Sequence, residues 1–186
     1  MVRTQVSFGR RLSIIPRSSR LLFLGLASLA VASGCAHGGV REGVYHAPAN
    51  RYQIDLPHGR WDQLSVKGSD LVLTSADKGM TILTGSLCGK YANAKLNVLS
   101  RNLFIGLGNR QVIASEPVEL PAGEGERIRV NADLEGSRFC VEAYTFRREP
   151  CVFDFVYLAV PEYFEVNLET FRSMMKTLRF SGKKQK

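Results

Sequence analysis

Histidine and cysteine are the residue types in this chain that could ligate a metal ion. The histidines are His37, His46 and His58, and no two of them are four residues apart on a helical segment. The four cysteines contain no C-x-x-C pair. A structural zinc site needs four such ligands, usually at short and regular spacings. The sequence therefore predicts no metal site and offers no motif for another cofactor.

One nucleophilic set can be drawn from Cys151, His58 and Asp154. Asp154, however, alternates with Phe153 and Phe155 in a β-rich segment, where a carboxylate normally points outward to solvent. The serines lack a G-x-S-x-G elbow. The sequence "GLGNR" closes a helical segment, whereas a dinucleotide-binding loop opens one. These observations favour a protein that is not an enzyme.

Arg127 and Arg129 are the residues that could contact a ligand. They lie two positions apart in "RIRV" and so share one face of a predicted strand. Two guanidinium groups side by side could bind a ligand carboxylate. We favour the simpler interpretation, in which both side chains lie on a solvated face.

The N-terminal 34 residues have the pattern of a signal peptide. Leu21–Ala32 is apolar and uncharged, and five arginines without any acidic residue precede it. A basic region followed by an apolar run of about a dozen residues is typical of secretory signals, whereas a membrane span needs roughly 20 residues. "ASGC" at 32–35 resembles a bacterial lipobox, which implies cleavage before Cys35 and its acylation. Multiple acyl chains anchor a protein stably.

The residue after the cysteine bears on location. Ala36 stands there, and by resemblance to Gram-negative lipoproteins it implies sorting to the periplasmic face of the outer membrane. Two alternatives are an ordinary signal peptide with an unrelated cysteine, and an N-terminal membrane helix. The expected location is therefore the cell envelope, with a lipid anchor.

Removal of the signal changes the charge balance. The whole chain has 25 basic and 17 acidic residues and a net charge of +8. Because five arginines and no acidic residue precede Cys35, the remainder has a net charge of only about +3. No basic cluster on one element remains, which argues against a nucleic-acid partner. We expect a lipidated cysteine and flexible tether over 35–50, one domain over 51–181, and a basic disordered tail over 182–186.

The domain should contain many strands and two helices. Period-2 alternation and turn residues predict strands at 52–57 and 61–68, a hairpin over 70–88 that turns at 77–79, and further strands at 110–123, 126–136, 137–146 and 151–160. Helices are predicted at 94–109, with Gly108 as a left-handed cap, and at 161–180, with apolar residues at 168, 171, 175 and 178 on one face. Short connections favour antiparallel pairing. The fold class is thus α+β, a mostly antiparallel sheet flanked by helices in an α/β/α sandwich.

The segment "YQIDLPHGRW" resembles the opening of PsbP-like domains, the fold of the photosystem II extrinsic protein and its bacterial relatives. The matching positions are Tyr52, Ile54, Pro57, Gly59 and Trp61. "FRSMMKTLRF" is similar to the closing helix of these domains. The chain is also similar to uncharacterised lipoproteins of deltaproteobacterial type, which place cysteines at positions corresponding to Cys88 and Cys151. The resemblance covers most of 52–180 and implies a PsbP-like fold.

One disulfide is expected, because export brings the domain into an oxidising compartment. If 137–146 and 151–160 form a hairpin, Cys140 lies roughly 23 Å from Cys151, beyond the reach of a disulfide. Cys88 must then pair with Cys140 or Cys151. The position of Cys88 and Cys151 at strand ends, together with the lipoprotein resemblance, favours the pair Cys88–Cys151 with Cys140 free.

Two classes of function remain. The first is a membrane-anchored, non-enzymatic accessory or assembly module that binds a protein in the cell envelope, as the PsbP-like resemblance implies. The second is a small-ligand-binding protein or a hydrolase whose site is built from loops. Converging titratable groups in a pocket would favour the second class, and an exposed apolar patch would favour the first.

Overall fold

The computed structural model describes residues 38–75, 79–89 and 94–181. The predicted signal peptide, Cys35 and the basic tail at 182–186 lie outside these residues. Two helices and eleven strands occur in the described part, and the α+β class predicted from the sequence is confirmed. Within the described ranges, no helix is long and apolar enough to cross a bilayer.

The main element is a seven-stranded, fully antiparallel sheet in the order β4-β5-β6-β10-β9-β8-β7. Its strands are β4 (Asp62–Leu64), β5 (Leu71–Ser75), β6 (Met80–Cys88), β7 (Gly108–Leu120), β8 (Gly123–Leu134), β9 (Ser137–Arg148) and β10 (Cys151–Ala159). Strands β7 to β10 form the predicted meander with short turns. Its β8–β9 turn holds Glu135 and Gly136 at positive φ, as a two-residue hairpin requires.

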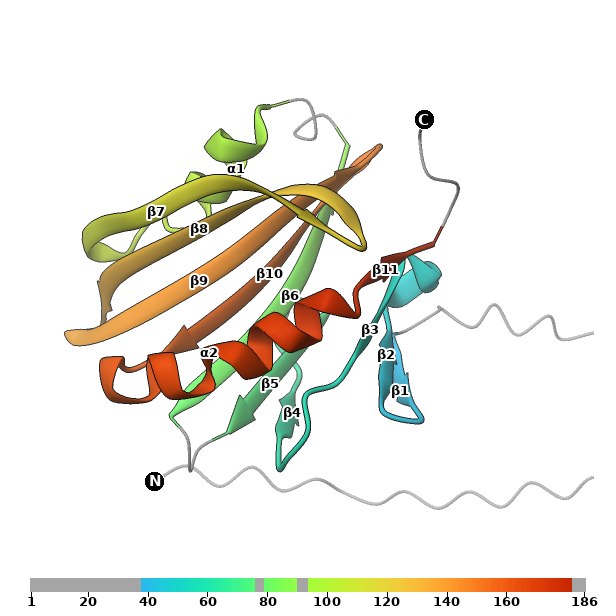
Figure 1. The fold of residues 1–186 in the computed structure, drawn as a ribbon, viewed down its shortest axis with the longest axis horizontal. Coiled ribbons are helices and arrows are strands. Elements are labelled where there is room, and N and C mark those ends of the chain that lie inside the picture. Colours follow the sequence, from blue (N-terminus) through green and yellow to red (C-terminus); the bar gives the residue numbers. More distant parts are fainter. Residues whose placement is uncertain (1–37, 76–78, 90–93, 182–186) are drawn as a thin grey trace, which may run out of the picture. The chain divides into compact units, whose positions relative to one another are not determined.

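Helix α2 (Pro161–Lys176) covers one face of this sheet, as Figure 1 shows. The predicted apolar stripe is confirmed: Leu168, Phe171, Met175 and Leu178 are all buried. Alternation along β10 turns its aromatic residues toward this helix. Tyr157 stacks on Phe171 with ring centroids 5.6 Å apart. The main core therefore lies between α2 and the large sheet.

Helix α1 (Leu96–Asn102) packs on the opposite face, against β8 and β9. A second apolar cluster lies there, formed by Phe104 with Ile128, Val130, Ala132, Val141, Ala143 and Val156. The helix is shorter than predicted, because the chain after Asn102 continues in three-residue turns. The left-handed glycine is Gly106, with φ 97°, and not Gly108, which begins β7.

A second, four-stranded sheet in the order β1-β2-β3-β11 corrects two predictions. Its strands are β1 (Gly39–Arg41), β2 (Val44–His46), β3 (Tyr52–Asp55) and β11 (Arg179–Phe180), with the short 3₁₀ helix η1 (Pro48–Asn50) before β3. The single sheet expected from the sequence is thus two sheets. The range assigned to a tether, 35–50, contains a β-hairpin from Gly39 onward, because Tyr45 is buried against Tyr52.

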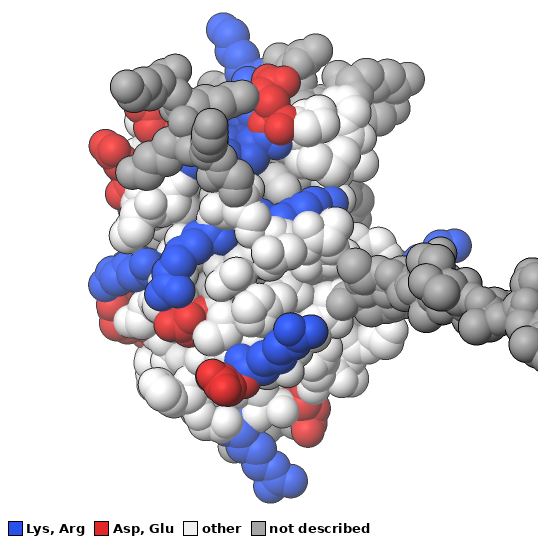
Figure 2. Space-filling view, turned by 90° about the vertical axis from the view of Figure 1, so that its right-hand side faces the viewer, with Lys and Arg blue, Asp and Glu red and all other residues white. Residues whose placement is uncertain are grey.

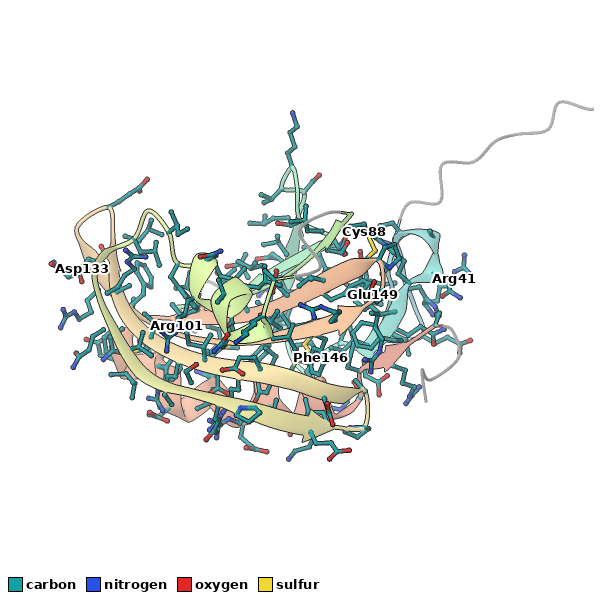
Figure 3. The ribbon with its side chains drawn as sticks, turned by 90° about the horizontal axis from the view of Figure 1, so that it is seen from above. Arg41, Cys88, Arg101, Asp133, Phe146 and Glu149 are labelled. Carbon is teal, nitrogen blue, oxygen red and sulfur yellow. A yellow bond between two sulfur atoms is a disulfide. The ribbon has the colours of Figure 1, made fainter. Side chains whose placement is uncertain are left out.

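The disulfide joins Cys88 and Cys151, and Cys140 is free and buried, as predicted. Cys88 and Cys151 face each other at the ends of β6 and β10, with Cα atoms 3.9 Å apart. Cys140 pairs with Ala159, at the other end of β10. The bridge therefore closes one rim of the large sheet, visible beside the Cys88 label in Figure 3.

Candidate functional site

The most distinctive surface of the domain is an apolar groove between α1 and the large sheet. Its cavity of about 200 Å³ is lined by Leu83, Leu103, Phe104, Leu107, Ala132, Leu134, Phe139, Val141, Val156 and Leu158. Period-2 alternation in β8, β9 and β10 places the sheet residues on this face, while the turn after α1 supplies the other wall. Every lining side chain is apolar, so the groove offers no side-chain hydrogen bond to an occupant.

Exposed apolar side chains surround this groove. Ile105, in the turn after α1, is 72% exposed, and Val98 on α1 and Leu134 at the end of β8 are also exposed. We call the groove together with these three residues the α1 face. In Figure 3, Arg101 marks α1 lying across the strands, and Asp133 marks the far end of β8. An apolar groove with an apolar rim is a typical interaction surface.

Asp154 lies in a second cavity of about 220 Å³ beneath α1, which shares Leu103 with the groove. The expectation that this carboxylate points into solvent is wrong. Asp154 faces Leu99 and Asn102 of α1 and accepts a 2.8 Å hydrogen bond from the Thr145 hydroxyl. Burial raises the pKa of Asp154 to about 6, which outweighs the opposite effect of the hydrogen bond.

Asp154→Asn is expected to remove a pH dependence of stability. The pKa of Asp154 is raised on folding, so its protonation stabilises the fold fully below the unfolded value near 4, and this contribution is lost as pH rises through about 6. The free energy of unfolding of the variant, measured relative to that of wild type, should therefore rise by on the order of 2 kcal/mol between pH 4 and pH 8. Urea melts of both proteins at the two pH values measure this difference, and Asp133→Asn serves as the control. Parallel pH profiles of wild type and Asp154→Asn would contradict the burial of this carboxyl group.

The nucleophilic set considered from the sequence is not assembled. The sulfur of Cys151 is bonded to Cys88. His58 lines a different cavity of about 400 Å³ beside α2, together with Asp55 and Glu169, whereas Asp154 lies beneath α1. Among the described residues, no group of three histidine, cysteine or acidic side chains is placed to hold a metal ion.

Arg127 and Arg129 lie on the α2 face of the sheet and bind carboxylates of this chain. Arg127 forms an ion pair with Glu116, and its Nη1 lies 3.9 Å from Glu142 Oε2. Arg129 forms an ion pair with Glu165 of α2. Both guanidinium groups are partly exposed and their partners Glu116 and Glu165 more so, which agrees with the solvated face that we favoured, and neither guanidinium stands alone as a site for a ligand carboxylate.

The centre of this charged group is Glu142, a fully buried residue of β9. Arg172 of α2 donates two hydrogen bonds to its carboxylate, at 2.9 and 2.7 Å, and the Tyr144 hydroxyl donates a third at 3.1 Å. A buried carboxylate bound by a bidentate arginine is satisfied and well oriented. We assign this cluster to the attachment of α2 and not to chemistry.

No family model matches the chain, and no curated protein matches it in sequence. Solved structures match it in fold. The solution structure of cyanobacterial PsbP (CyanoP) from Synechocystis sp. PCC 6803 aligns with a TM-score of 0.59 at 11% identity, covering 80% of this chain and 95% of that one. LpqN of Mycobacterium tuberculosis, described as involved in cell envelope biogenesis, aligns with a TM-score of 0.52 at 12% identity. This alignment covers 70% of this chain and 84% of that one.

A third similar structure is the Pseudomonas aeruginosa protein PA94, described as a protein of unknown function and putative regulator. It aligns with a TM-score of 0.50 at 11% identity, and the alignment covers 70% of this chain and 92% of that one. The PsbP-like fold predicted from the sequence is therefore confirmed. Identities this low show the fold alone.

Sequence reasoning missed the α1 face. Its sheet residues were expected to be covered by a helix that ends at Gly106 or Gly108. These two glycines were used to place the end of the helix, but the described helix already ends at Asn102, and no sequence signal marks that earlier end. A shorter helix leaves apolar sheet surface uncovered, and the groove lies there.

Proposed function

We propose that this protein is a lipid-anchored accessory module of the cell envelope, which binds a protein partner through the α1 face. The main support for this proposal is the apolar groove, together with the exposed apolar side chains around it. The lipobox-like sequence at 32–35 supports the anchor. The similar fold of LpqN, a protein described as involved in cell envelope biogenesis, supports an envelope role.

The charge distribution supports a protein and not a nucleic acid as the partner. Figure 2 shows the end of the molecule that carries the small sheet, where basic and acidic side chains are interspersed with uncharged surface. Nucleic-acid binding depends on basic side chains gathered on one surface. The α1 face itself is apolar, which suits a protein surface.

The dimensions of the α1 face favour a protein over a small ligand. The groove holds about 200 Å³, and ligand pockets for small molecules usually hold about 300–1,000 Å³. An occupant enclosed in the groove would leave Ile105 and Val98 in water. A partner helix laid across α1 and β8 would cover the groove and both side chains together.

The anchor is tested by Cys35→Ala in the native host. The variant should lose labelling by a palmitate analogue and leave the membrane fraction, because its acylation site is gone. Unchanged labelling would refute acylation at Cys35.

The partner is tested by a photo-crosslinking residue at position 105 of the full chain in its native envelope. We expect one discrete protein adduct, and no such adduct from position 166 on α2, where Val166 is 78% exposed but outside the α1 face. Leu134→Asp should reduce the adduct at position 105 about tenfold, because it places a charge at the rim of the apolar groove that the partner must cover. A lipid or small-molecule adduct at position 105 would support the alternative, a small-ligand-binding protein.

A further inference from the structure

The described chain begins at a fixed point on the surface. Gly38 is the first described residue, and strand pairing begins next to it, where Gly39 pairs with His46. Gly38 packs so closely against Tyr45 that an added Cβ would lie 2.9 Å from the Tyr45 Cζ atom. The Tyr45 hydroxyl in turn donates to the Asp70 carbonyl, just before β5. The point where the chain enters the domain is therefore held against the β4–β5 region.

Only three residue steps separate Cys35 from Gly38. A fully extended chain spans at most about 3.6 Å per residue, so the Cα of Cys35 lies within about 11 Å of Gly38. An acyl group on Cys35 must be embedded in the bilayer. The surface around Gly38 is consequently held close to the lipid headgroups and cannot move far from them.

The segment 62–68, comprising β4 and the turn after it, is an exposed part of that surface. Gly38 lines a cavity of about 600 Å³ together with residues 63–66 of this segment and with Ser69 and Asp70. All residues from 62 to 68 are exposed, including Leu64 at 49% and Val66 at 48%. Lys67 follows them directly. Two exposed apolar side chains beside a lysine suit the interface of an anionic membrane.

We propose that segment 62–68 lies against the bilayer, with Leu64 and Val66 among the headgroups and Lys67 directed to anionic lipid. This inference rests on the proposed lipid anchor. The occupant is lipid because the anchor is too short to let another body between this surface and the membrane. The acyl chains hold the protein on the membrane, and the segment fixes how the domain is oriented.

The test uses the full acylated chain in vesicles of phosphatidylcholine and phosphatidylglycerol that contain a headgroup nitroxide quencher. A fluorophore is attached through Val66→Cys or, as the matched control, through Val112→Cys. Val112 is 50% exposed on β7, the opposite edge strand of the large sheet. Six strand spacings separate β4 from β7, or roughly 29 Å. A Cys140→Ala background removes the free thiol, and the other two thiols of the domain form the disulfide.

Quenching at position 66 should be at least threefold stronger than at position 112. Lys67→Glu should reduce the difference in vesicles that contain phosphatidylglycerol. Equal quenching at the two positions in acylated, vesicle-bound protein overturns the orientation and leaves the anchor intact. Absence of acylation in the wild-type chain refutes the anchor itself and the inference with it. A label at position 66 that is shielded from an aqueous quencher but not quenched by the lipid nitroxide would show that a second copy of this chain covers the surface, which also overturns the inference.

Discussion

Phe171→Ala is expected to lower the free energy of unfolding by about 3–5 kcal/mol, the usual cost of deleting a buried aromatic side chain. Phe171 is fully buried in the middle of α2. Its ring stacks on Tyr157 and contacts Tyr144, at centroid distances of 5.6 and 5.7 Å. Because both tyrosines belong to central strands of the sheet, they cannot move far to fill the cavity that the variant leaves.

Denaturant melts of the domain measure this loss, and Val166→Ala is the matched control on the same helix. Val166 is exposed to solvent, so its truncation should change stability by less than about 0.5 kcal/mol. A similarly small change for Phe171→Ala would mean that α2 does not pack on the sheet as described.

Local periodicity sufficed to predict the elements around Phe171. The stripe on α2 has helical spacing over its whole length, and β8, β9 and β10 are long strands of 12, 12 and 9 residues. Such long patterns favour extended strands that pair as neighbours, although β9 and β10 are buried on both faces. The same hairpin excluded a Cys140–Cys151 bridge, because Cys140 pairs with Ala159 at the end of β10 away from Cys151; the choice of Cys88–Cys151 over Cys88–Cys140 rested on the strand-end positions and on the lipoprotein resemblance.

The small sheet could not be predicted in the same way. Its strands β1 and β2 have three residues each, too few for a periodic signal. The turn between them, Glu42 and Gly43 at positive φ, has the same residue types as the β8–β9 turn, but the strands that flank it are too short to mark it as a hairpin. The hairpin exists because Tyr45 packs on Tyr52, which is a contact between separate elements.

In the candidate site, too, contacts between separate elements could not be predicted from the sequence. Spacing placed Arg127 and Arg129 on one face of a strand, which is correct, but spacing cannot name partners from other elements. Glu116 reaches Arg127 from β7, and Glu165 reaches Arg129 from α2. Asp154 was misjudged for a related reason, because both faces of the sheet are covered and neither position on β10 is outward.

Arg172→Met should destabilise the domain by about 3 kcal/mol, at the lower end of the loss seen when one partner of a buried ion pair is removed. The variant leaves the fully buried Glu142 without its two hydrogen bonds from the guanidinium. The lower end is expected because the Tyr144 hydroxyl still donates to Glu142 and Arg127 remains 3.9 Å away. Denaturant melts at neutral pH measure the loss.

Lys176→Met is the matched control for this prediction. Lys176 forms an ion pair with Glu169 on the same helix, at 3.1 Å, and both side chains are mostly exposed. An exposed pair contributes at most about 1 kcal/mol, so this variant should change little. Equal losses for Arg172→Met and Lys176→Met would contradict the buried position of Glu142.

The double variant Glu142→Leu/Arg172→Met separates the ion pair from simple packing. When both partners are replaced by apolar side chains, no buried charge is left uncompensated, and such replacements are often neutral or stabilising. Most of the loss caused by Arg172→Met should therefore be recovered, while Arg127 keeps its partner Glu116. If the double variant loses as much free energy of unfolding as the two single variants together, the two residues act independently. The ion pair would then not be the contact that attaches α2 to β9.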